Sequence, residues 1–219
     1  MSASPFVVAI DGPAASGKGT LSRALALRFR LAHLDTGRLY RAAALLLLER
    51  GEDPADAKAA QAAASRVEPG LLEDPRLREE RVGAAASIIA ANEAVRRALL
   101  HYQREFAAHP PLPAEGAVLD GRDIGSLVCP LAQLKLFLTA SVAERARRRV
   151  EELRARGAPA IYEEVLAELK ERDLRDRMRC SAPLAAAADA VRIETTRLAP
   201  EEVFERASQL VARALASAR

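Results

Sequence analysis

Short apolar runs alternate along the chain with longer segments whose apolar residues recur at helical spacing. Residues 6–10, 116–120 and 134–138 are rich in Val, Leu, Ile or Phe, and Pro, Gly or Asp mark the ends of the first two runs, which is typical of buried strands. Weaker runs at 31–34 and 189–194 predict two further strands. Strands that alternate with helices predict an α/β fold with a parallel sheet of about five strands, covered by helices on both faces.

The helical segments have recognisable ends. Asp35, Thr36 and Gly37 offer a strand end and a cap for the next helix, and Pro183 limits a charged helix that runs towards Cys180. The segment 67–78 contains two Pro and one Gly and is expected to be irregular, and 109–113 is expected to be a stiff linker. The expected helices are 17–29, 38–50, 52–65, 79–91, 93–107, 142–156, 162–180 and 200–216.

Composition narrows the class of protein. The chain has 219 residues, of which 50% are hydrophobic, and this suits one large domain with a sizeable core. The longest candidate membrane run, 42–48, is far short of about 20 residues, and the N-terminus has no basic region or cleavage site of a secretory signal. Cys129 and Cys180 lie far apart and the three His form no cluster, so neither disulfides nor zinc are expected. We therefore expect a cytoplasmic protein that does not enter the membrane.

Arg dominates the basic residues. All but four of the 33 Lys and Arg are Arg, yet the net charge is only +3 and 4% of residues are aromatic, which argues against a nucleic-acid coat. Most of the Arg excess is interpreted as compositional bias, although individual guanidinium groups grip phosphate with paired donors. Lys58, Lys135 and Lys170 are expected at the surface, whereas Lys18 lies in the strongest motif of the chain.

That motif is a glycine-rich loop that leaves the first strand and opens the first helix. Such a loop curls so that successive backbone N–H groups face one anion, and the helix N-terminus adds further donors. Lys18 can reach the outer phosphates of a nucleotide. The usual pattern has Ser or Thr directly after the Lys, but Gly19 stands there, so Thr20 is only a candidate for the metal-binding hydroxyl. The predicted phosphate-binding residues are Gly12, Pro13, Ala14, Ala15, Ser16, Gly17, Lys18, Gly19 and Thr20.

Several motifs in sequence order resemble the nucleoside monophosphate kinases, and within that group the bacterial cytidylate kinases. The similarity covers nearly the whole chain. The matching pieces are Ile10-Asp11-Gly12-Pro13 through Thr20, Asp35-Thr36-Gly37 with Tyr40-Arg41, Asp120-Gly121-Arg122-Asp123, and Glu171-Arg172-Asp173 on to Arg179 and Ala182-Pro183-Leu184. The resemblance implies a P-loop NTPase-like core of 5–40, 114–145 and 186–219, a monophosphate-binding insertion at about 41–113 and a lid at about 146–182.

Asp120 closes a buried strand at its carboxyl end, where open α/β sheets place ligands. A carboxylate there can hold Mg²⁺ directly or through water, although Asp also serves often as a cap or turn residue. The resemblance implies that Arg122 contacts phosphate and that Asp123 helps to read the acceptor base. It also implies that Arg41 meets the monophosphate, with Thr36 helping to form that pocket.

Ser87 and Arg96 look like ordinary helix positions from the residues alone. The resemblance implies that they contact cytosine, which needs an acceptor for its exocyclic amine and donors for N3 and O2; Asp123, Arg96 and Ser87 can supply that set.

The segment 168–180 is the densest charge run in the chain. Arg172, Asp176 and Arg179 are spaced so that they share one helix face, while a pair such as Asp173 with Arg177 can be an ordinary salt bridge along the helix. A solvated, salt-bridged helix is the simple interpretation. The resemblance implies instead that Arg172 and Asp176 hold the acceptor sugar and that Arg179 holds its phosphate.

The lid region carries a second group of arginines, of which one or more is implied to close over ATP. Arg148 is the best match among Arg145, Arg147, Arg148 and Arg149. One departure from the family is the short segment 66–82, which replaces a longer insertion with extra β structure and leaves the preference among cytidine, deoxycytidine and uridine monophosphates open.

The resemblance implies transfer of the ATP γ-phosphoryl group to CMP or dCMP, with Mg²⁺. A monomer is expected, because the sequence shows no interface signature. The groups expected to act on the transferring phosphoryl group are Lys18, Arg122 and Arg179. A uridylate kinase or a broader pyrimidine monophosphate kinase is the alternative enzyme. A regulatory nucleotide-binding module is the alternative from another class, and it would hydrolyse ATP slowly without depending on an acceptor.

Overall fold

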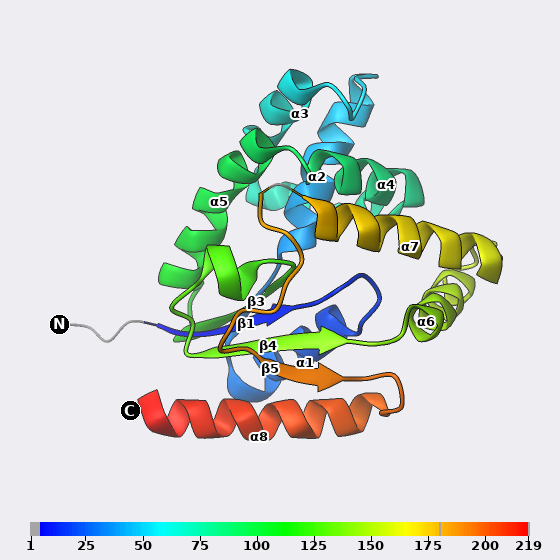
Figure 1. The fold of residues 1–219 in the computed structure, drawn as a ribbon. Helices are drawn as coiled ribbons and strands as arrows, with labels where there is room; N and C mark the ends of the chain where they lie inside the picture. Colours follow the sequence, from blue (N-terminus) through cyan, green and yellow to red (C-terminus); the bar gives the residue numbers. More distant parts are fainter. Residues whose placement is uncertain (1–4, 180, 219) are drawn as a thin grey trace. The chain divides into compact units, whose positions relative to one another are not determined.

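The computed structural model describes residues 5–179 and 181–218 and divides into two compact units. Unit 1 combines Met1–His33 with Ala107–Arg219, and unit 2 is Leu34–Phe106. The described elements of both units are drawn in Figure 1. In chain order they are β1 (Phe6–Asp11), α1 (Lys18–Phe29), β2 (Ala32–Asp35), α2 (Thr36–Glu49), α3 (Ala57–Ala64), η1 (Pro69–Glu73), η2 (Pro75–Arg78), α4 (Glu80–Ile89), α5 (Glu93–Ala108), β3 (Gly116–Gly121), η3 (Ile124–Val128), β4 (Leu134–Thr139), α6 (Val142–Ala155), α7 (Tyr162–Met178), β5 (Val191–Glu194) and α8 (Pro200–Ala218).

The expected α/β architecture is confirmed. The described strands form one five-stranded sheet in the order β2-β3-β1-β4-β5. The central strand β1 pairs in parallel with β3 and β4, and β4 pairs in parallel with β5. Because parallel strands need crossover connections, β1 meets partners that lie far away in the sequence, and Phe6 stands opposite Gly116.

One face of this sheet carries an apolar core. Alternate residues of β1 (Phe6, Val8 and Ile10) point to the same side, where they pack with α1 and α8. Val203 and Val211 supply part of the cover from α8, which runs along the sheet in Figure 1. Burial on this scale is the main term that stabilises the unit.

The opposite face meets η3, and this corrects one expectation. Lys135 was expected at the surface, but it lies on β4 with only 8% of its area exposed. Its aliphatic stem runs beside Gly125 of η3, where an added Cβ would lie 3.1 Å from Lys135 Cδ, and its Nζ donates to Asp189 at 2.9 Å. The long stem is therefore covered while the ammonium group reaches a carboxylate at the edge.

Helices α6 and α7 form a hairpin with a small apolar core of its own. Val150 and Leu153 of α6 pack with Val165 and Leu169 of α7, and Ala14 of the glycine-rich loop joins the same cluster. Ser141 caps α6 because its hydroxyl accepts from the Glu144 N–H. The helix expected at 162–180 ends at Met178, and Cys180 lies outside the described residues.

Unit 2 is built around α2. This helix packs against α3 and α4 through small side chains such as Ala42, Ala43 and Ala44, all of which are fully buried. It starts at Thr36, two residues before the expected position, because Asp35 with an extended backbone is the N-cap. Helix α3 starts only at Ala57, after Asp56 caps the N–H groups of Lys58 and Ala59. The segment expected to be irregular contains the short 3₁₀ helices η1 and η2.

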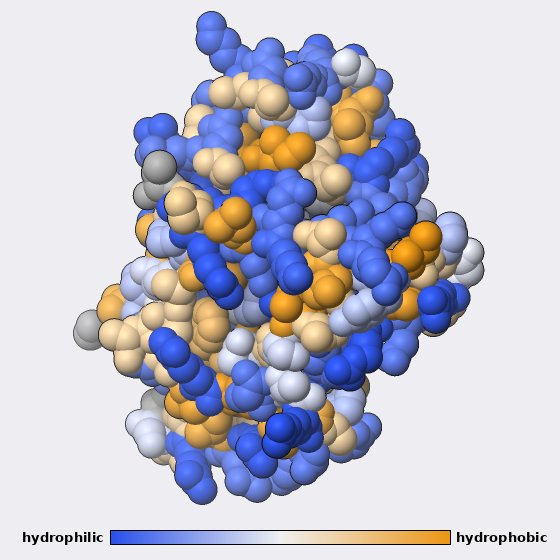
Figure 2. Space-filling model, turned by 45° about the vertical axis from the view of Figure 1, so that its right-hand side comes forward, coloured by the Kyte–Doolittle hydropathy of each residue, from blue (hydrophilic) through white to orange (hydrophobic). Residues whose placement is uncertain are grey.

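The surface carries isolated apolar residues. Leu27, Leu112 and Leu131 are each at least 85% exposed, and they come from different parts of the chain. On the face drawn in Figure 2, hydrophilic residues predominate and hydrophobic residues form small separate patches. Single exposed apolar residues are normal on a folded protein. Among the described helices, none has the length and apolarity needed to cross a membrane.

Candidate active site

The glycine-rich loop has the backbone strain that its glycines were expected to permit. Gly12 has φ +149°, and a Cβ added there would lie 2.1 Å from the Leu138 carbonyl oxygen on the neighbouring strand. Gly17 has φ +91° immediately before α1, and Ala15 also adopts a positive φ of 57°. The loop therefore turns sharply between a buried strand and a helix N-terminus, which is the geometry of a backbone anion cradle.

Lys18 lies at the centre of this loop. It is 6% exposed, and its Nζ donates to the Pro13 carbonyl oxygen at 2.7 Å, so the side chain folds back along the loop. Burial, together with the positive charges of Arg122 and Arg172, lowers the pKa of Lys18 to about 7, against the opposing effects of Asp120 and Asp11. This ammonium group is in a place where an added negative charge would be strongly favoured.

Two hydroxyl groups of the loop differ in their surroundings. Ser16 is 1% exposed, and within the described residues its Oγ has no hydrogen-bond partner. A buried hydroxyl without a partner is uncommon and fits a site whose ligand supplies the missing acceptor or donor. Thr20 is exposed on the first turn of α1, beyond Gly19.

Two carboxylates end the central strands beside the loop. Asp11, at the end of β1, accepts from the Ile124 N–H at 2.7 Å and from the Gly125 N–H at 2.8 Å, and so fixes η3. Burial raises the pKa of Asp11 to about 6, although those two hydrogen bonds oppose the rise. Asp120, on β3, is 5% exposed, and its Oδ2 lies 2.8 Å from His33 Nε2.

The oxygen donors present fit Mg²⁺ only if a nucleotide contributes to its coordination. Asp120 and Thr20 offer a carboxylate and a hydroxyl, which are the ligands that this ion prefers. No group of three or more His, Cys, Asp or Glu in the described residues could hold a metal ion alone. Mg²⁺ commonly binds through one or two carboxylates together with substrate phosphates and water.

A charge network joins the loop after β3 to α7. The Arg122 Nε donates to Asp176 Oδ2 at 3.0 Å, and Arg179 pairs with the other oxygen of the same carboxylate. Asp176 is 1% exposed. Burial alone would raise its pKa, but Arg122, Arg179 and Arg172 outweigh burial and hold the pKa below its ordinary value. The structure thus brings together the sequence-predicted group Arg122, Arg172, Asp176 and Arg179.

Two further residues predicted from the sequence, Asp123 and Arg148, lie in unit 1. Asp123 is 5% exposed and directly precedes η3, close enough to Asp11 for the two charges to interact. Arg148 donates from Nη1 to Thr195 Oγ1 at 3.0 Å and from Nη2 to the Thr195 carbonyl oxygen at 2.6 Å. The described contacts of Arg148 therefore hold it against the end of β5.

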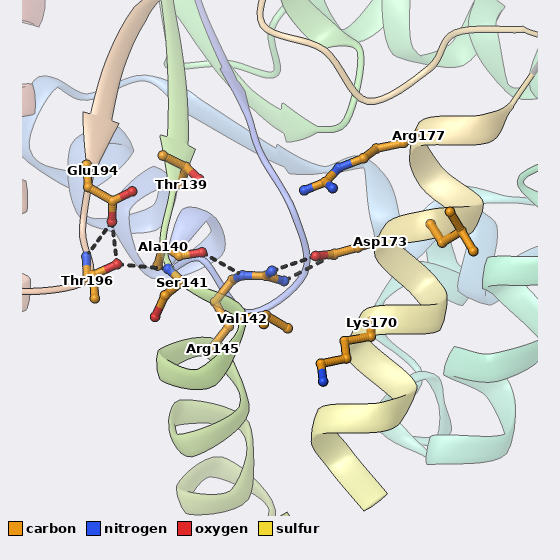
Figure 3. A pocket seen from close by; sticks show the side chains of 11 residues that line it. Thr139, Ala140, Ser141, Val142, Arg145, Lys170, Asp173, Arg177, Glu194 and Thr196 are labelled. Carbon is orange, nitrogen blue, oxygen red and sulfur yellow. Dashed lines mark hydrogen bonds and ion pairs between the residues drawn. The ribbon is translucent and has the colours of Figure 1, made fainter. Parts of the chain in front are cut away.

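A cavity of about 550 Å³ opens beside the loop, between the ends of β4 and β5 and the α6–α7 hairpin. Figure 3 shows Lys170, Asp173 and Arg177 reaching into it from α7, with Glu194 and Thr196 on the β5 side. Its wall includes a buried ion pair in which Arg145 Nη2 lies 2.5 Å from Asp173 Oδ2. Asp173, for which helical spacing offered Arg177 as a partner, thus pairs across the hairpin with Arg145.

Unit 2 holds the other four predicted substrate residues. Arg41, on α2, donates to the Leu77 carbonyl oxygen at 2.8 Å, and its guanidinium packs over Gly83 of α4. Arg96 is 6% exposed and lies over the Tyr40 ring at 5.7 Å from its centroid. Thr36 and Ser87 are each 3% exposed. Arg96, interpreted from the residues alone as a surface charge, and Ser87, interpreted as a small helix residue, are thus both buried polar groups.

The comparison with known proteins agrees with these motifs. Residues 8–213 match the family model described as cytidylate kinase. The chain belongs to the cytidylate kinase family. It is 52% identical to a cytidylate kinase of Rhodospirillum rubrum over 94% of this chain and 97% of the relative, and 57% identical to one of Methylobacterium sp. strain 4-46 over 84% and 86%. A solved sugar kinase of Janibacter sp. HTCC2649 covers 95% of both chains with a TM-score of 0.50 at 12% identity, which shows a shared fold alone.

Sequence reasoning on this member of the cytidylate kinase family missed four residues near the loop. Asp11 and His33 received no role, although Asp11 directly follows a strand and precedes the loop, a position that could have drawn attention. Arg145 was considered only together with its neighbours, and its pairing with Asp173 was not predicted. Their pairing joins residues 28 positions apart in sequence, and no local spacing signals such a contact.

Proposed function

We propose that this protein is a cytidylate kinase that transfers the γ-phosphoryl group of ATP to the 5′-phosphate of CMP or dCMP, giving CDP or dCDP and ADP. Membership of the family supports the reaction class. The observation that carries the proposal is the accumulation of positive charge beside the glycine-rich loop. Lys18, Arg122 and Arg172 are close enough together to depress the pKa of Lys18.

Such a cluster is unfavourable by itself, because like charges repel and buried charges lose hydration. A polyphosphate would relieve both effects. The loop N–H groups and Lys18 would bind the donor phosphates, and the hydroxyl of Ser16, which has no hydrogen-bond partner within the described residues, is available to the same ligand. Arg148 would lie on the donor side through its place at the end of β5.

Mg²⁺ would be held by Asp120 and Thr20 together with the phosphates, and it would supply charge neutralisation at the transferring group. His33 would orient the Asp120 carboxylate through their 2.8 Å contact. A metal ligand held by such an outer hydrogen bond keeps a fixed direction.

Each unit by itself carries residues for which we propose a role towards the acceptor. In unit 1, Arg122 and Arg179 would bind the acceptor phosphate, and Arg172 and Asp176 its sugar. In unit 2, Arg41 and Thr36 would hold the phosphate side, and Ser87 and Arg96 would read the cytosine edge, with Asp123 of unit 1 accepting from its exocyclic amine.

The reaction needs no protein nucleophile or dedicated general base. The acceptor phosphate is largely ionised near neutral pH, so its oxygen can attack without prior proton removal. Catalysis then rests on bringing donor and acceptor into line and on neutralising the charge that spreads over the transferring oxygens. Lys18, Arg122 and Arg179 are the groups proposed for that neutralisation.

The test measures ADP formation from Mg-ATP with CMP, dCMP, UMP, AMP or no acceptor. We expect strong stimulation by CMP and dCMP. Stimulation by UMP to a similar extent would instead support the broader pyrimidine monophosphate kinase, and slow acceptor-independent hydrolysis would support a regulatory nucleotide-binding module. We further propose that the enzyme acts in the cytoplasm as a monomer, which gel filtration of the purified chain would check.

A further inference from the structure

The guanidinium of Arg145 joins three separate segments of unit 1. Its Nε donates to the Ala140 carbonyl oxygen at 3.0 Å, next to the start of its own helix. Its Nη1 donates to the Ala14 carbonyl oxygen at 3.2 Å, inside the glycine-rich loop, and to Asp173 Oδ1 at 3.1 Å. Its Nη2 donates to Asp173 Oδ2 at 2.5 Å. One buried side chain therefore connects the end of β4, the phosphate-binding loop and α7.

An independent contact holds the same loop residue to the same hairpin. The Ala14 side chain is 8% exposed and packs into the apolar cluster formed by α6 and α7. Ala14 is thus fixed through both its side chain and its carbonyl group. Because Ala15 beside it has a positive φ, this part of the loop has a strained backbone that needs support from its surroundings.

The pair is unlike the other ion pairs of α6. Arg147 and Arg156 pair with glutamates on their own helix, and their side chains are 62% and 40% exposed. Arg145 and Asp173 are 3% and 8% exposed and form a two-pronged pair across two helices. Both charged groups of a buried pair lose their hydration, so such a pair often adds little to the stability of the fold. The two-pronged geometry instead favours one fixed arrangement of the three segments.

Helix α7 carries both Asp173 and the carboxylate that binds the proposed acceptor-phosphate arginines. Asp176 lies about one turn further along the helix and pairs with Arg122 and Arg179. Helix α7 is therefore connected to the donor loop through Asp173 and to the proposed acceptor-phosphate groups through Asp176. Any shift of α7 against Ala14 changes the spacing between these two sets of groups.

We propose that Arg145 and Asp173 are a positioning pair that sets the distance between the phosphate-binding loop and the arginines on and directly after α7. The pair acts through Ala14 and α7 and contacts no reacting atom. This inference rests on the proposed function, because the distance matters only if a phosphoryl group passes between the two sets. A misplacement of about 1 Å can lower the rate of such a reaction about 100-fold.

The test compares Asp173→Asn, Asp173→Glu and Arg145→Lys with two controls. Asp189→Asn breaks the exposed partner of Lys135 in the same unit, and Val211→Ala destabilises the core around α8 without touching the hairpin. Each variant is assayed for kcat and for the KM values of ATP and CMP, well below its own melting temperature. Hydrogen–deuterium exchange of residues 12–20 is measured without nucleotide.

We expect Asp173→Asn to lower kcat about 10- to 100-fold while both KM values stay within about threefold of wild type. Asp173→Glu, which keeps the charge, should recover part of the lost rate. Exchange of residues 12–20 should become at least about threefold faster in Asp173→Asn and stay unchanged in both controls.

Wild-type kcat in folded Asp173→Asn and Arg145→Lys would overturn the proposal. So would an equal fall of kcat in Val211→Ala at matched stability, or the failure of all three hairpin variants to fold, which would assign the pair to stability alone. A wild-type protein that phosphorylates no nucleoside monophosphate would overturn the proposed function instead. The exchange of residues 12–20 would still decide whether the pair positions the loop.

Discussion

The carboxylate of Asp176 binds Arg122 on one oxygen and Arg179 on the other, so a single buried anion holds two arginines from different segments. The guanidinium groups can therefore stay close to each other before any substrate arrives. This preorganisation reduces the rearrangement that would otherwise accompany binding of an anionic acceptor.

Replacement of the Asp176 carboxylate should weaken binding of the acceptor more than binding of ATP. We expect Asp176→Ala to raise the KM for CMP about 10- to 100-fold, the range for loss of a hydrogen bond to a charged group, and to change the KM for ATP less than about threefold. Steady-state kinetics with each substrate varied in turn check this. Glu171→Ala, which removes an exposed partner of Arg175 on the same helix, is the matched control. Equal effects on both substrates would contradict the sugar-binding role.

Binding of the donor should be accompanied by proton uptake. The pKa of Lys18 is about 7 without ligand, so at pH 8 its amine is mostly neutral, and a neighbouring phosphate should raise that pKa. Titration calorimetry of a non-hydrolysable ATP analogue, in two buffers with different ionisation enthalpies, should show uptake of about one proton at pH 8. The same experiment with Lys18→Met should show almost none. The wild-type affinity should also fall as pH rises above 7, and a pH-independent affinity would contradict this assignment.

The same pKa has a consequence for stability. Unfolding returns Lys18 towards its ordinary pKa of 10.5, so between about pH 7 and 10.5 the unfolded chain binds the extra proton and the contribution of this group to stability rises with pH. Chemical denaturation of wild type and Lys18→Met at pH 7 and pH 9 should show that the free energy of unfolding of the wild type, relative to that of the variant, is larger at pH 9. A difference that does not change with pH would rule out the lowered pKa.

Substitution by Ala should lower stability much more at Gly12 than at Gly19, although both glycines belong to the same glycine-rich motif. Gly12→Ala places a Cβ against the Leu138 carbonyl oxygen at a positive φ and should lower the free energy of unfolding by about 2–4 kcal/mol. Gly19→Ala meets nothing within 4 Å on α1 and should change stability by less than about 1 kcal/mol, in either direction. Urea denaturation of both variants checks the pair, and similar losses in both would show that the steric contact is not the cause.

The contribution of Asp11 to stability, through its two hydrogen bonds to η3, should depend on pH. Asp11→Asn keeps one acceptor but offers an amide to the second N–H, which should lower the free energy of unfolding by about 1–3 kcal/mol. The folded-state pKa is raised to about 6 from 3.8, so the native state binds the extra proton between these values and the wild type loses stability from this group as pH rises through them. The loss measured for Asp11→Asn should therefore be larger at pH 4 than at pH 7.

The sequence predicted the parts of the molecule whose signals are local. Strands β1, β3 and β4 stand out as apolar runs, and the glycine-rich loop could be placed because a strand precedes it and a helix follows. Helical spacing predicted that Arg172 and Asp176 of α7 share a face. Arg179 lies directly after the end of α7 and still reaches Asp176, and the structure adds Arg122 as a further partner of that carboxylate.

Long-range partners could not be predicted in the same way. Arg145 stands among several neighbouring arginines, and only the packing of α6 on α7 selects it for Asp173. Lys135 looked like a surface residue because its side chain is charged, but its position on β4 under η3 covers the stem. In both cases the deciding contact joins segments that are distant in the chain, so the neighbouring residues in the sequence do not indicate it.

The placement of unit 2 within the chain also sets an order of events during synthesis on the ribosome. Strand β1 and helix α1 emerge before the two strands that pair with β1, which begin at Gly116 and Leu134, and all of Leu34–Phe106 emerges in between. The core face of β1 is completed only when Val203 and Val211 of α8 follow β5. The nascent chain therefore carries an apolar strand without its neighbours for most of translation, a stage at which exposed strand edges favour aggregation.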